Sequence, residues 1–384
     1  MVAACPFPYP RGTPIRIYRM AEALSQRGHN VHVITYHLGN RSVPLNFRLH
    51  RIQNIPTYQK LSSGPTYQKL LLVDPFMVLL LCRVLKIMPF DLIHAHHFEG
   101  LLVAKLGGIG HRIPVIFDAH TLLESELPHY RLGLPIGLKK RVGAFLDQRL
   151  PIGADHIIAV TDQIKLRMKH YGYLDRKVTV VYNGVECDHF NQGSYVCANT
   201  GPNTKIVAYA GSMDDFQGID LLLKAFQKAL MQRDDMQLMI ITQSSFDKYR
   251  SLAQELRIWP HICLVHSNFQ DLPSHLVKAD IVLNPRIDCD GYPVKLLNYM
   301  ASGKPIVSFE GSAKNLVHGV NGWIVRDADI HAFADAITML LEKPLLAQSL
   351  GIKAKEHSSK MHSWEAIARK LEMVYDATIK SYRK

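Results

Sequence analysis

The chain has 384 residues, of which 47% are hydrophobic and 20% charged, and it carries a formal net charge of +12 with a pI near 9.3. This composition excludes a disordered or fibrous chain, and the length exceeds one ordinary hydrophobic core, which predicts two domains. The basic charge favours an anionic partner, such as a nucleotide diphosphate or an anionic membrane surface. Because the sequence lacks a compact basic stripe and an aromatic platform, we expect no nucleic-acid partner.

The first half of the chain alternates apolar strand-like runs with helical patterns. A short run at 2–5 is followed by Gly12 and Thr13, by a helical pattern and by a second run at 32–36. Strand, glycine-bearing turn, helix and strand form the opening of a Rossmann-like unit. The turn lacks GxGxxG, so NAD binding is not expected. Further runs without polar alternation, typical of a parallel sheet covered on both faces, lie at 91–94, 114–117, 156–160 and 178–181.

The most apolar window, residues 70–81, is twelve residues long, whereas a membrane-spanning helix needs about twenty. It predicts a helix that is buried or lies in a membrane interface, with burial favoured. The six cysteines form no CxxC pair, and the start shows no secretory signal pattern, as is typical of a reducing compartment. We therefore expect a cytoplasmic protein, with the positive charge favouring peripheral attachment to the inner face of the membrane.

A stretch rich in Gly, Asn, Thr, Ser and Pro at 183–205 interrupts this alternation and indicates a domain boundary. A second alternating set follows, with strands at 206–209, 237–242, 262–265, 281–284, 305–308 and 322–325. We expect an N-terminal Rossmann-like domain, a linker, a C-terminal Rossmann-like domain and a last helix that packs back on the N-terminal domain, at residues 1–186, 187–204, 205–365 and 366–384.

Residues 290–307, DGYPVKLLNYMASGKPIV, closely resemble the donor-binding segment of the family-4 retaining glycosyltransferases. Other segments follow in the family's order: RGHNVHVIT, DLIHAHH, PVIFDAH, ADHIIAVT, VTVVYNGVE, AYAGSMDDFQGIDLLLKAF and GVNGWIV. The resemblance covers nearly the whole chain. It implies an α/β protein of GT-B fold, with two Rossmann-like doubly wound parallel-sheet domains facing a central cleft. The N-terminal domain would take the acceptor and the C-terminal domain the nucleotide-sugar donor.

The chemistry of the donor segment follows from its residue types. Gly291 and Pro293 form a turn that opens a helix, and the first amides of that helix, of Val294 and Lys295, lack intrahelical acceptors and can bind a diphosphate. The helix dipole favours an anion there by about 0.3–1 kcal/mol, and Lys295 adds a full charge. The predicted donor site at this turn comprises Asp290, Gly291, Tyr292, Pro293, Val294, Lys295 and Leu296.

Two acidic positions of the family motif are altered. The resemblance implies two glutamates eight residues apart, one near the donor sugar and one on the ribose, and Asp290 and Asn298 stand in their places. We expect Asp290 to act beside the sugar and Asn298 to bind a ribose hydroxyl. The alternative for Asn298 is a helix residue that is satisfied by the backbone or by solvent.

The glycine turn after the strand at 206–209 departs further from the family. The resemblance implies an arginine after Gly211 and a lysine before the next glycine, but the chain has Ser212 and Gln217. A charged hydrogen bond contributes about 1.5–3 kcal/mol, so the loss of two would weaken diphosphate binding. We name Lys295 and Lys314 as candidates to compensate.

In the N-terminal domain, His120 follows the strand at 114–117, where the resemblance implies a histidine against the donor sugar. Such a histidine can stabilise the oxocarbenium-like centre that forms as the phosphate leaves, or bind a sugar hydroxyl. The alternative is a hydrogen-bonded loop histidine without a catalytic role. Gly12 and Thr13 match the family's loop that approaches the donor phosphate and the acceptor.

Two strings resemble metal sites, but we expect neither to bind a metal. Residues 288–290 spell the DxD string that binds manganese in another glycosyltransferase fold, yet here the string coincides with the donor turn. His94, His96 and His97 lack the companions and spacing typical of zinc ligands, which favours strand packing and cleft lining. We therefore predict no cofactor besides the nucleotide-diphosphate sugar, which is a substrate.

These observations together predict a retaining, metal-independent glycosyltransferase. It would move a sugar from a nucleotide-diphosphate donor to a saccharide or lipid-linked acceptor in cell-envelope or polysaccharide synthesis. Two alternatives stay open. One is a nucleotide-sugar epimerase of the same fold, and the other is a non-catalytic nucleotide-sugar binder, which Ser212, Gln217 and Asn298 favour.

Overall fold

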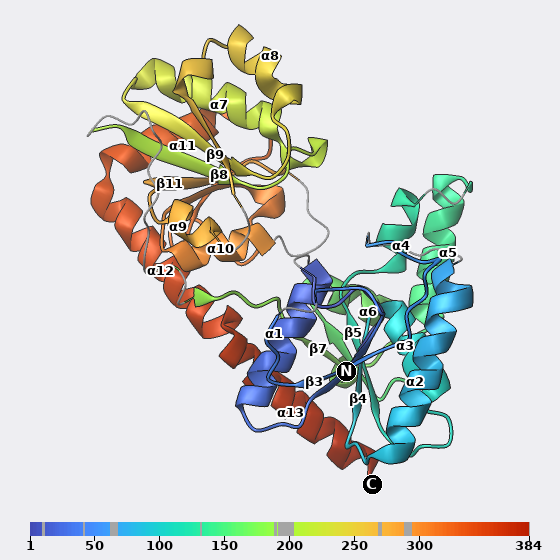
Figure 1. Ribbon diagram of the computed structural model, residues 1–384. Coiled ribbons are helices and arrows are strands. Elements are labelled where there is room, and N and C mark those ends of the chain that lie inside the picture. Colours follow the sequence, from blue (N-terminus) through green and yellow to red (C-terminus); the bar gives the residue numbers. More distant parts are fainter. Residues whose placement is uncertain are drawn as a thin grey trace. The chain divides into compact units, whose positions relative to one another are not determined.

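The structure is a computed structural model, and it describes residues 1–9, 12–40, 43–61, 68–130, 133–187, 190, 203–267, 271–287 and 294–383. The chain divides into two compact units (Figure 1). Unit 1 comprises Met1–Gly184 and Trp364–Lys384, and unit 2 comprises Val185–Ser363. The chain therefore leaves unit 1, forms unit 2 and returns to unit 1 for its last helix.

Unit 1 is built on a parallel sheet of seven strands in the order β3-β2-β1-β4-β5-β6-β7. Its strands are β1 (Val2–Ala3), β2 (His32–Thr35), β3 (Arg48–Arg51), β4 (Ile93–His96), β5 (Val115–Ala119), β6 (His156–Ala159) and β7 (Val178–Val180). The order reverses between β1 and β4, and ligands of open α/β sheets bind beyond the carboxyl ends of the strands at such a switch point.

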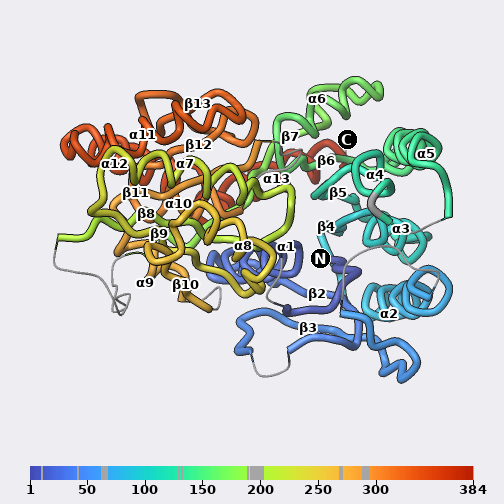
Figure 2. Tube along the Cα trace, turned by 90° about the horizontal axis from the view of Figure 1, so that it is seen from above, coloured from blue at the N-terminus to red at the C-terminus, as the bar shows by residue number. Residues whose placement is uncertain are grey.

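The helical segments of unit 1 are α1 (Gly12–Gln26), η1 (Lys69–Val73, a π-helix), α2 (Asp74–Ile87), α3 (His97–Gly107), α4 (Leu123–Glu126), η2 (Leu127–His129), α5 (Ile136–Arg149), α6 (Asp162–His170), η3 (Asp175–Lys177) and α13 (Trp364–Tyr382). Figure 2 shows α2 and α3 along one face of the sheet and α1 along the other.

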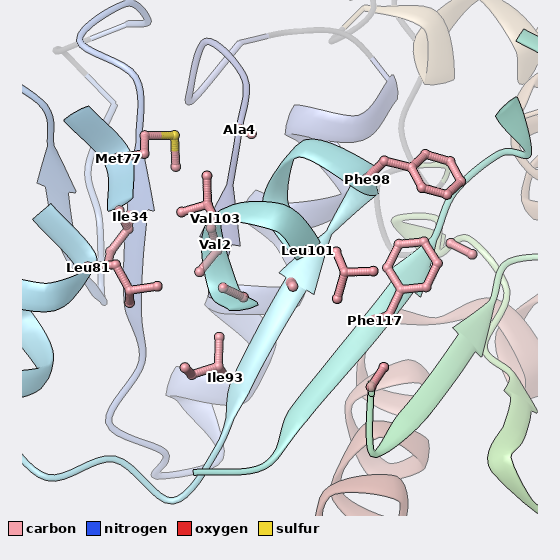
Figure 3. Close-up of a cluster of buried hydrophobic side chains, with 14 of the residues drawn as sticks. Val2, Ala4, Ile34, Met77, Leu81, Ile93, Phe98, Leu101, Val103 and Phe117 are labelled. Atoms are coloured by element: carbon pink, nitrogen blue, oxygen red, sulfur yellow. The ribbon is translucent and has the colours of Figure 1, made fainter. Parts of the chain in front are cut away.

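Neighbouring residues along these strands face opposite sides of the sheet. Val2, Ile34 and Phe117 belong to the cluster that packs against α2 and α3 (Figure 3). The adjacent Ala3 and Val33 belong to a second cluster that packs against α1 and α13. Helices thus cover both faces, which explains why the strands are apolar runs without polar alternation.

The last helix, α13, is tied to unit 1 at its surface and in its core. Arg27, directly after α1, forms a bidentate ion pair with Glu372, in which both N–O distances are 2.7 Å. Deeper in the unit, Tyr375 Oη lies 2.7 Å from Nδ1 of His94 on β4. The helix therefore contributes a side chain to the polar cluster at the middle of the unit 1 sheet.

Unit 2 has a parallel sheet of six strands in the order β10-β9-β8-β11-β12-β13. Its strands are β8 (Lys205–Ala210), β9 (Met236–Thr242), β10 (Ile262–His266), β11 (Ile281–Asn284), β12 (Ile306–Phe309) and β13 (Trp323–Val325). The order reverses between β8 and β11. The predicted pair of doubly wound parallel sheets is confirmed.

The helical segments of unit 2 are η5 (Asp215–Gln217), α7 (Ile219–Gln232), α8 (Asp247–Glu255), η6 (Trp259–His261), α9 (Leu272–Leu276), α10 (Val294–Ser302), η7 (Glu310–Ser312), α11 (Ile330–Glu342) and α12 (Pro344–His362). The core of the unit lies between the sheet and helices that include α7 and α11. Within the described part of the whole chain, no helix combines the length and apolarity needed to cross a membrane.

Two features of unit 1 differ from the sequence expectation. The pattern does not predict β3, because its residues RLHR are mostly basic and sit at the edge of the sheet beside β2. The apolar window at 70–81 forms the end of η1 and the start of α2. It buries Met77 and Leu81, but Leu71 is 68% exposed. The predicted burial is therefore correct for one face of this segment only.

Candidate functional site

His120 lies directly after β5, at the carboxyl end of the unit 1 sheet. The residue is 8% exposed, and its Nε2 lies 3.4 Å from Asp118 Oδ2 and 3.2 Å from His96 Nδ1. Asp118 belongs to β5 itself and is completely buried. Because Asp118 and His120 are two residues apart on an extended segment, both side chains lie on the same face and can contact each other.

Arg16 of α1 neutralises the buried carboxylate. Its Nη2 and Nε lie 3.2 and 3.3 Å from Asp118 Oδ2. Other guanidinium hydrogens are donated to the carbonyl oxygens of Val181, at 3.0 Å, and Tyr182, at 2.7 Å. A buried ion pair is tolerated when further hydrogen bonds satisfy its remaining donors, as they do here. Arg16 thereby connects α1, β5 and the segment that follows β7.

His97 connects His120 to the glycine turn of unit 1. It begins α3 with a left-handed φ of +62°, a conformation that costs a non-glycine residue about 1–3 kcal/mol. Its ring stacks on His120 with centroids 4.7 Å apart, and its Nε2 lies 3.0 Å from Thr13 Oγ1. Thr13 and the exposed Gly12 form the start of α1. Two segments that the sequence predicted for the site therefore meet through His97.

The cluster combines an ionised carboxylate with neutral imidazoles. Burial lowers the pKa of His120 to about 4, although the Asp118 carboxylate opposes this shift. Burial also lowers the pKa of His94 and His96. Burial opposes ionisation of Asp118, but the Arg16 and His120 contacts outweigh it and hold the pKa of Asp118 well below the usual carboxylate value. At neutral pH, His120 is therefore a neutral hydrogen-bonding group held by a charged one.

His94, His96 and Asp118 offer potential metal-ligand atoms that lie within 4.8 Å of one another. Arg16 occupies both carboxylate oxygens, however, and a cation bound there would face its positive charge at close range. His94 and His96 stack with ring centroids 4.2 Å apart inside the core. We therefore interpret these groups as a hydrogen-bonded core cluster that supports His120.

In unit 2, the glycine turn after β8 is held against α10 by Tyr299. The Ala210 amide donates to Tyr299 Oη at 2.7 Å, and Tyr299 Oη donates to the Ala210 carbonyl at 3.1 Å. Tyr209 Oη donates to the Ser212 carbonyl at 2.9 Å. The Ser212 hydroxyl itself donates to Asp214 Oδ2 at 2.6 Å. The turn is thus positioned by tyrosine hydroxyls from β8 and α10.

Three predicted donor residues meet at this turn. Lys295 Nζ donates to Gln217 Oε1 at 2.6 Å, although the two residues are 78 positions apart in the chain. Gln217 Nε2 in turn lies 3.4 Å from Ser212 Oγ. The structure therefore brings the positive charge of Lys295 to the position in the turn where the sequence lacks a lysine.

The other predicted donor residues have less direct roles. Leu296 is fully buried, so its side chain belongs to the core, while Val294 is 39% exposed at the helix start. Asn298 is buried and its Nδ2 lies 3.4 Å from the Val294 carbonyl, which corresponds to the backbone-satisfied alternative. Lys314 lies two residues after η7 and is half-buried. Four predicted residues lie outside the described part of the chain: Asp290, Gly291, Tyr292 and Pro293.

Sequence reasoning missed the charged partners that hold these groups. Arg16 stands on the apolar face of a helix, and Asp118 stands inside an apolar strand run. A charged residue in the core requires a partner of opposite charge. The sequence therefore does carry a signal for this pair, since each of the two charges stands within an apolar pattern. Arg286 lies beside Phe216 of the unit 2 turn. The sequence carries no comparable signal for it, because it follows the end of β11, where a charged residue does not interrupt an apolar pattern.

Two family models match the chain. Residues 10–189 match Glycosyltransferase Family 4, and residues 204–343 match Glycosyl transferases group 1. The D-inositol 3-phosphate glycosyltransferase of Corynebacterium glutamicum is 29% identical over 315 residues, covering 76% of this chain and 73% of that protein. Its counterpart from Corynebacterium diphtheriae is 26% identical over 306 residues, covering 75% and 71%.

Solved structures resemble the chain over both units. Sucrose-phosphate synthase from Thermosynechococcus elongatus has a TM-score of 0.77 at 19% identity and covers 99% of this chain and 98% of its own. Anabaena HepE in complex with UDP has a TM-score of 0.75 at 16% identity, with 98% and 99% covered. WaaG, a glycosyltransferase involved in lipopolysaccharide biosynthesis, has a TM-score of 0.66 at 16% identity, with 97% and 98% covered. The predicted GT-B fold is confirmed.

Proposed function

The chain belongs to the family-4, group-1 glycosyltransferases, and we propose that it transfers a sugar, with retention and without a metal ion, from a nucleoside-diphosphate sugar to a saccharide or lipid-linked acceptor. Unit 2 binds the donor in this proposal, and unit 1 supplies His120 and receives the acceptor. The product belongs to cell-envelope or polysaccharide synthesis.

The observation that carries this proposal is the hydrogen bond from Lys295 to Gln217. It holds a cation between the turn after β8 and the first residues of α10, whose amides have no intrahelical acceptors. A helix start with an added lysine attracts a diphosphate. The same groups stabilise the charge that develops on the leaving diphosphate, so the reaction does not require a metal. The solved complex of HepE with UDP supports a nucleoside diphosphate as the ligand.

His120 has the properties of a group that contacts the transferred sugar. Its lowered pKa keeps the imidazole neutral at physiological pH, so it does not repel a positive centre on the sugar. Asp118 holds the ring, and its negative charge lies close behind it. An oxocarbenium-like transition state is stabilised by such an arrangement. Asp290 is proposed to act beside the sugar from unit 2.

The acceptor is proposed to carry negative charge or to be bound to an anionic membrane. The net charge of +12 supports this, because a basic protein is attracted to anionic lipid headgroups and to phosphorylated acceptors. The relatives named D-inositol 3-phosphate glycosyltransferases also support a phosphorylated acceptor. The exposed Leu70, Leu71 and Leu72 of η1 would add apolar contact with lipid. We propose a cytoplasmic location.

Thermal unfolding with UDP, GDP and ADP tests the donor proposal. We expect one of these nucleotides to raise the melting temperature, because a ligand at a hundredfold excess over its Kd stabilises a folded protein by about 2.7 kcal/mol. The matching nucleotide sugar should then support transfer to saccharide acceptors in the presence of EDTA, with the anomeric configuration retained by NMR. No stabilisation by any of the three nucleotides would contradict the proposal.

The variant His120→Ala tests the role of unit 1. We expect kcat to fall by about 10²-fold or more with a smaller change in the KM for donor, because the contact is made mainly in the transition state. His170→Ala, an exposed histidine at the end of α6, is the matched control. A sugar altered without any acceptor would instead support the epimerase, and nucleotide binding without turnover would support the non-catalytic binder.

A further inference from the structure

The turn that should hold a diphosphate is itself acidic. Residues 211–218 read GSMDDFQG and contain two aspartates but neither lysine nor arginine. Asp214 accepts a hydrogen bond from the Ser212 hydroxyl, and Asp215 forms an ion pair with Lys248 of α8. A diphosphate that binds at this turn therefore requires positive charge from other segments. Lys295 is one source, and a single lysine balances only part of the charge of a nucleoside diphosphate.

Arg286 is the second cation at the turn. Strand β11 ends at Asn284, and Pro285 and Arg286 follow directly. The guanidinium carbon of Arg286 lies 4.9 Å from the centroid of the Phe216 ring, which is 56% exposed. A guanidinium over an aromatic face is held there by cation–π attraction. Arg286 itself is half-buried.

The backbone at Arg286 is fixed from two sides. On one side, Gly218 lies so close that an added Cβ would overlap the Pro285 carbonyl oxygen. On the other, the Ser312 hydroxyl donates to the Arg286 carbonyl oxygen. Ser312 is held in turn by Asn284, whose Nδ2 lies 2.8 Å from Ser312 Oγ inside the core. These contacts therefore fix the position of the Arg286 backbone beside the turn.

Lys295 is held beside the turn by Tyr209 of β8 as well as by Gln217. Lys295 Nζ lies 4.7 Å from the centroid of the Tyr209 ring. The Tyr209 hydroxyl donates to the Ser212 carbonyl. Arg286, which follows β11, and Lys295 of α10 thus lie beside Phe216 and Gln217 of the turn that lacks the family's arginine and lysine.

We propose that Arg286 and Lys295 together form the clamp for the two linked phosphates of the donor, in place of the basic residues that the turn lacks. Arg286 supplies the planar fork that binds two phosphate oxygens at once, and Lys295 supplies a compact charge at the helix start. This inference rests on the proposed function. It gives Arg286 the role of a donor-binding residue.

Calorimetric titration of Arg286→Gln tests the clamp. The probes are UDP, GDP and ADP, together with inorganic pyrophosphate, which tests the phosphates without a base. We expect the Kd for pyrophosphate and for the preferred nucleotide to rise about tenfold or more, because a charged two-point contact is lost. The Kd values of Arg286→Lys should lie between those of Arg286→Gln and those of the unaltered protein. The salt dependence of binding should also become shallower in Arg286→Gln.

The matched control is Arg250→Gln, since Arg250 also lies over an aromatic ring, with 4.6 Å from its guanidinium carbon to the centroid of Trp259. We expect this variant to bind as the unaltered protein does. If Arg286→Gln fails to fold, Phe216→Leu keeps the charge but removes the ring, and a rise in Kd of about two- to fivefold is expected.

The outcomes separate the two proposals. An unaltered protein that binds none of the four probes contradicts the proposed function itself. An unaltered protein that binds a diphosphate with the same Kd as Arg286→Gln overturns the clamp and leaves the proposed function standing.

Discussion

The pair of Arg16 and Asp118 illustrates how single charged residues control the core of unit 1. Asp118 contacts His94, His96 and His120 with one oxygen at 3.3–3.5 Å, and Arg16 binds both oxygens. The carboxylate stays ionised in a fully buried position because the guanidinium outweighs the cost of burial. The orientation of His120 therefore depends on two buried residues, while its neutral state follows from its own burial.

Replacement of Asp118 by asparagine should be strongly destabilising. The amide keeps the shape but leaves the Arg16 charge buried without a counter-ion, so the free energy of unfolding should fall by about 3–5 kcal/mol in urea denaturation. Asp175→Asn is the control, because Asp175 is 61% exposed and pairs with Lys165 and Lys169 at the surface. The control should leave the free energy of unfolding nearly unchanged, because exposed ion pairs contribute little. Similar losses in the two variants would contradict this account of the cluster.

At the scale of elements, the close contact between the start of α7 and the end of β11 organises unit 2. Gly218 caps α7 with a φ of +71° and lies against Pro285. This contact allows η5, with Phe216 and Gln217, to approach Arg286 and Lys295. Glycine is required here for two independent reasons, the left-handed backbone and the lack of space for a Cβ.

Gly218→Ala and Gly319→Ala separate these two reasons, because both glycines have a φ of +71° but Gly319 has no atom within 4 Å of an added Cβ. Gly319→Ala should cost about 1–2 kcal/mol from the backbone alone. Gly218→Ala should lower the free energy of unfolding by more than this, because the added Cβ would overlap the Pro285 carbonyl oxygen. It should also weaken binding of the preferred nucleoside diphosphate, because the segment after β11 and η5 must move apart. Denaturation and calorimetry measure the two effects. Equal costs with unchanged nucleotide affinity would show that the contact is unimportant.

The elements also show which patterns can be recognised without a structure. The buried strands are predicted because apolar runs of this length are stable only between two helical layers. The edge strand β3 is not predicted, since a half-covered edge tolerates the basic residues Arg48 and Arg51. The exposed leucines of η1 are missed for a related reason: an evenly apolar window does not indicate which face lies against the core.

At the scale of the whole molecule, acid stability should follow the buried histidines. Burial lowers the pKa of His120 and of His156 to about 4, from an ordinary value of 6.5. Between these values the two imidazoles bind more protons in the unfolded chain than in the folded protein, so their contribution to stability is complete above pH 6.5 and falls as the pH drops towards 4. Burial raises the pKa of Asp74 and Asp147 to about 6, which acts in the opposite direction. The contribution of Asp118 to stability is complete above the ordinary carboxylate pKa of 3.8 and is lost only as the pH falls further, because the folded protein holds this pKa well below that value.

Melting temperatures measured from pH 8 to pH 4 check this expectation. We expect a plateau above about pH 6.5 and a progressive decrease below it. His156→Gln should reduce the decrease, because glutamine does not titrate and His156, bound to Thr179 in the sheet, lies outside the candidate site. A decrease of the same size in His156→Gln and in the unaltered protein would contradict the role of this buried imidazole.

Local sequence was enough to recognise two doubly wound sheets, the glycine turns and the helix start at Val294, because apolar runs, glycines and helix caps act over a few residues. It also placed His120 and Lys295 at the ends of core elements. The pairing of charges required the folded chain. Arg16 contacts Asp118, which lies 102 positions away in the chain, and Lys295 contacts Gln217, which lies 78 positions away. Arg286, directly after β11, contacts Phe216 of η5. Such long-range contacts depend on the order of strands in each sheet, and a local pattern carries no information about that order.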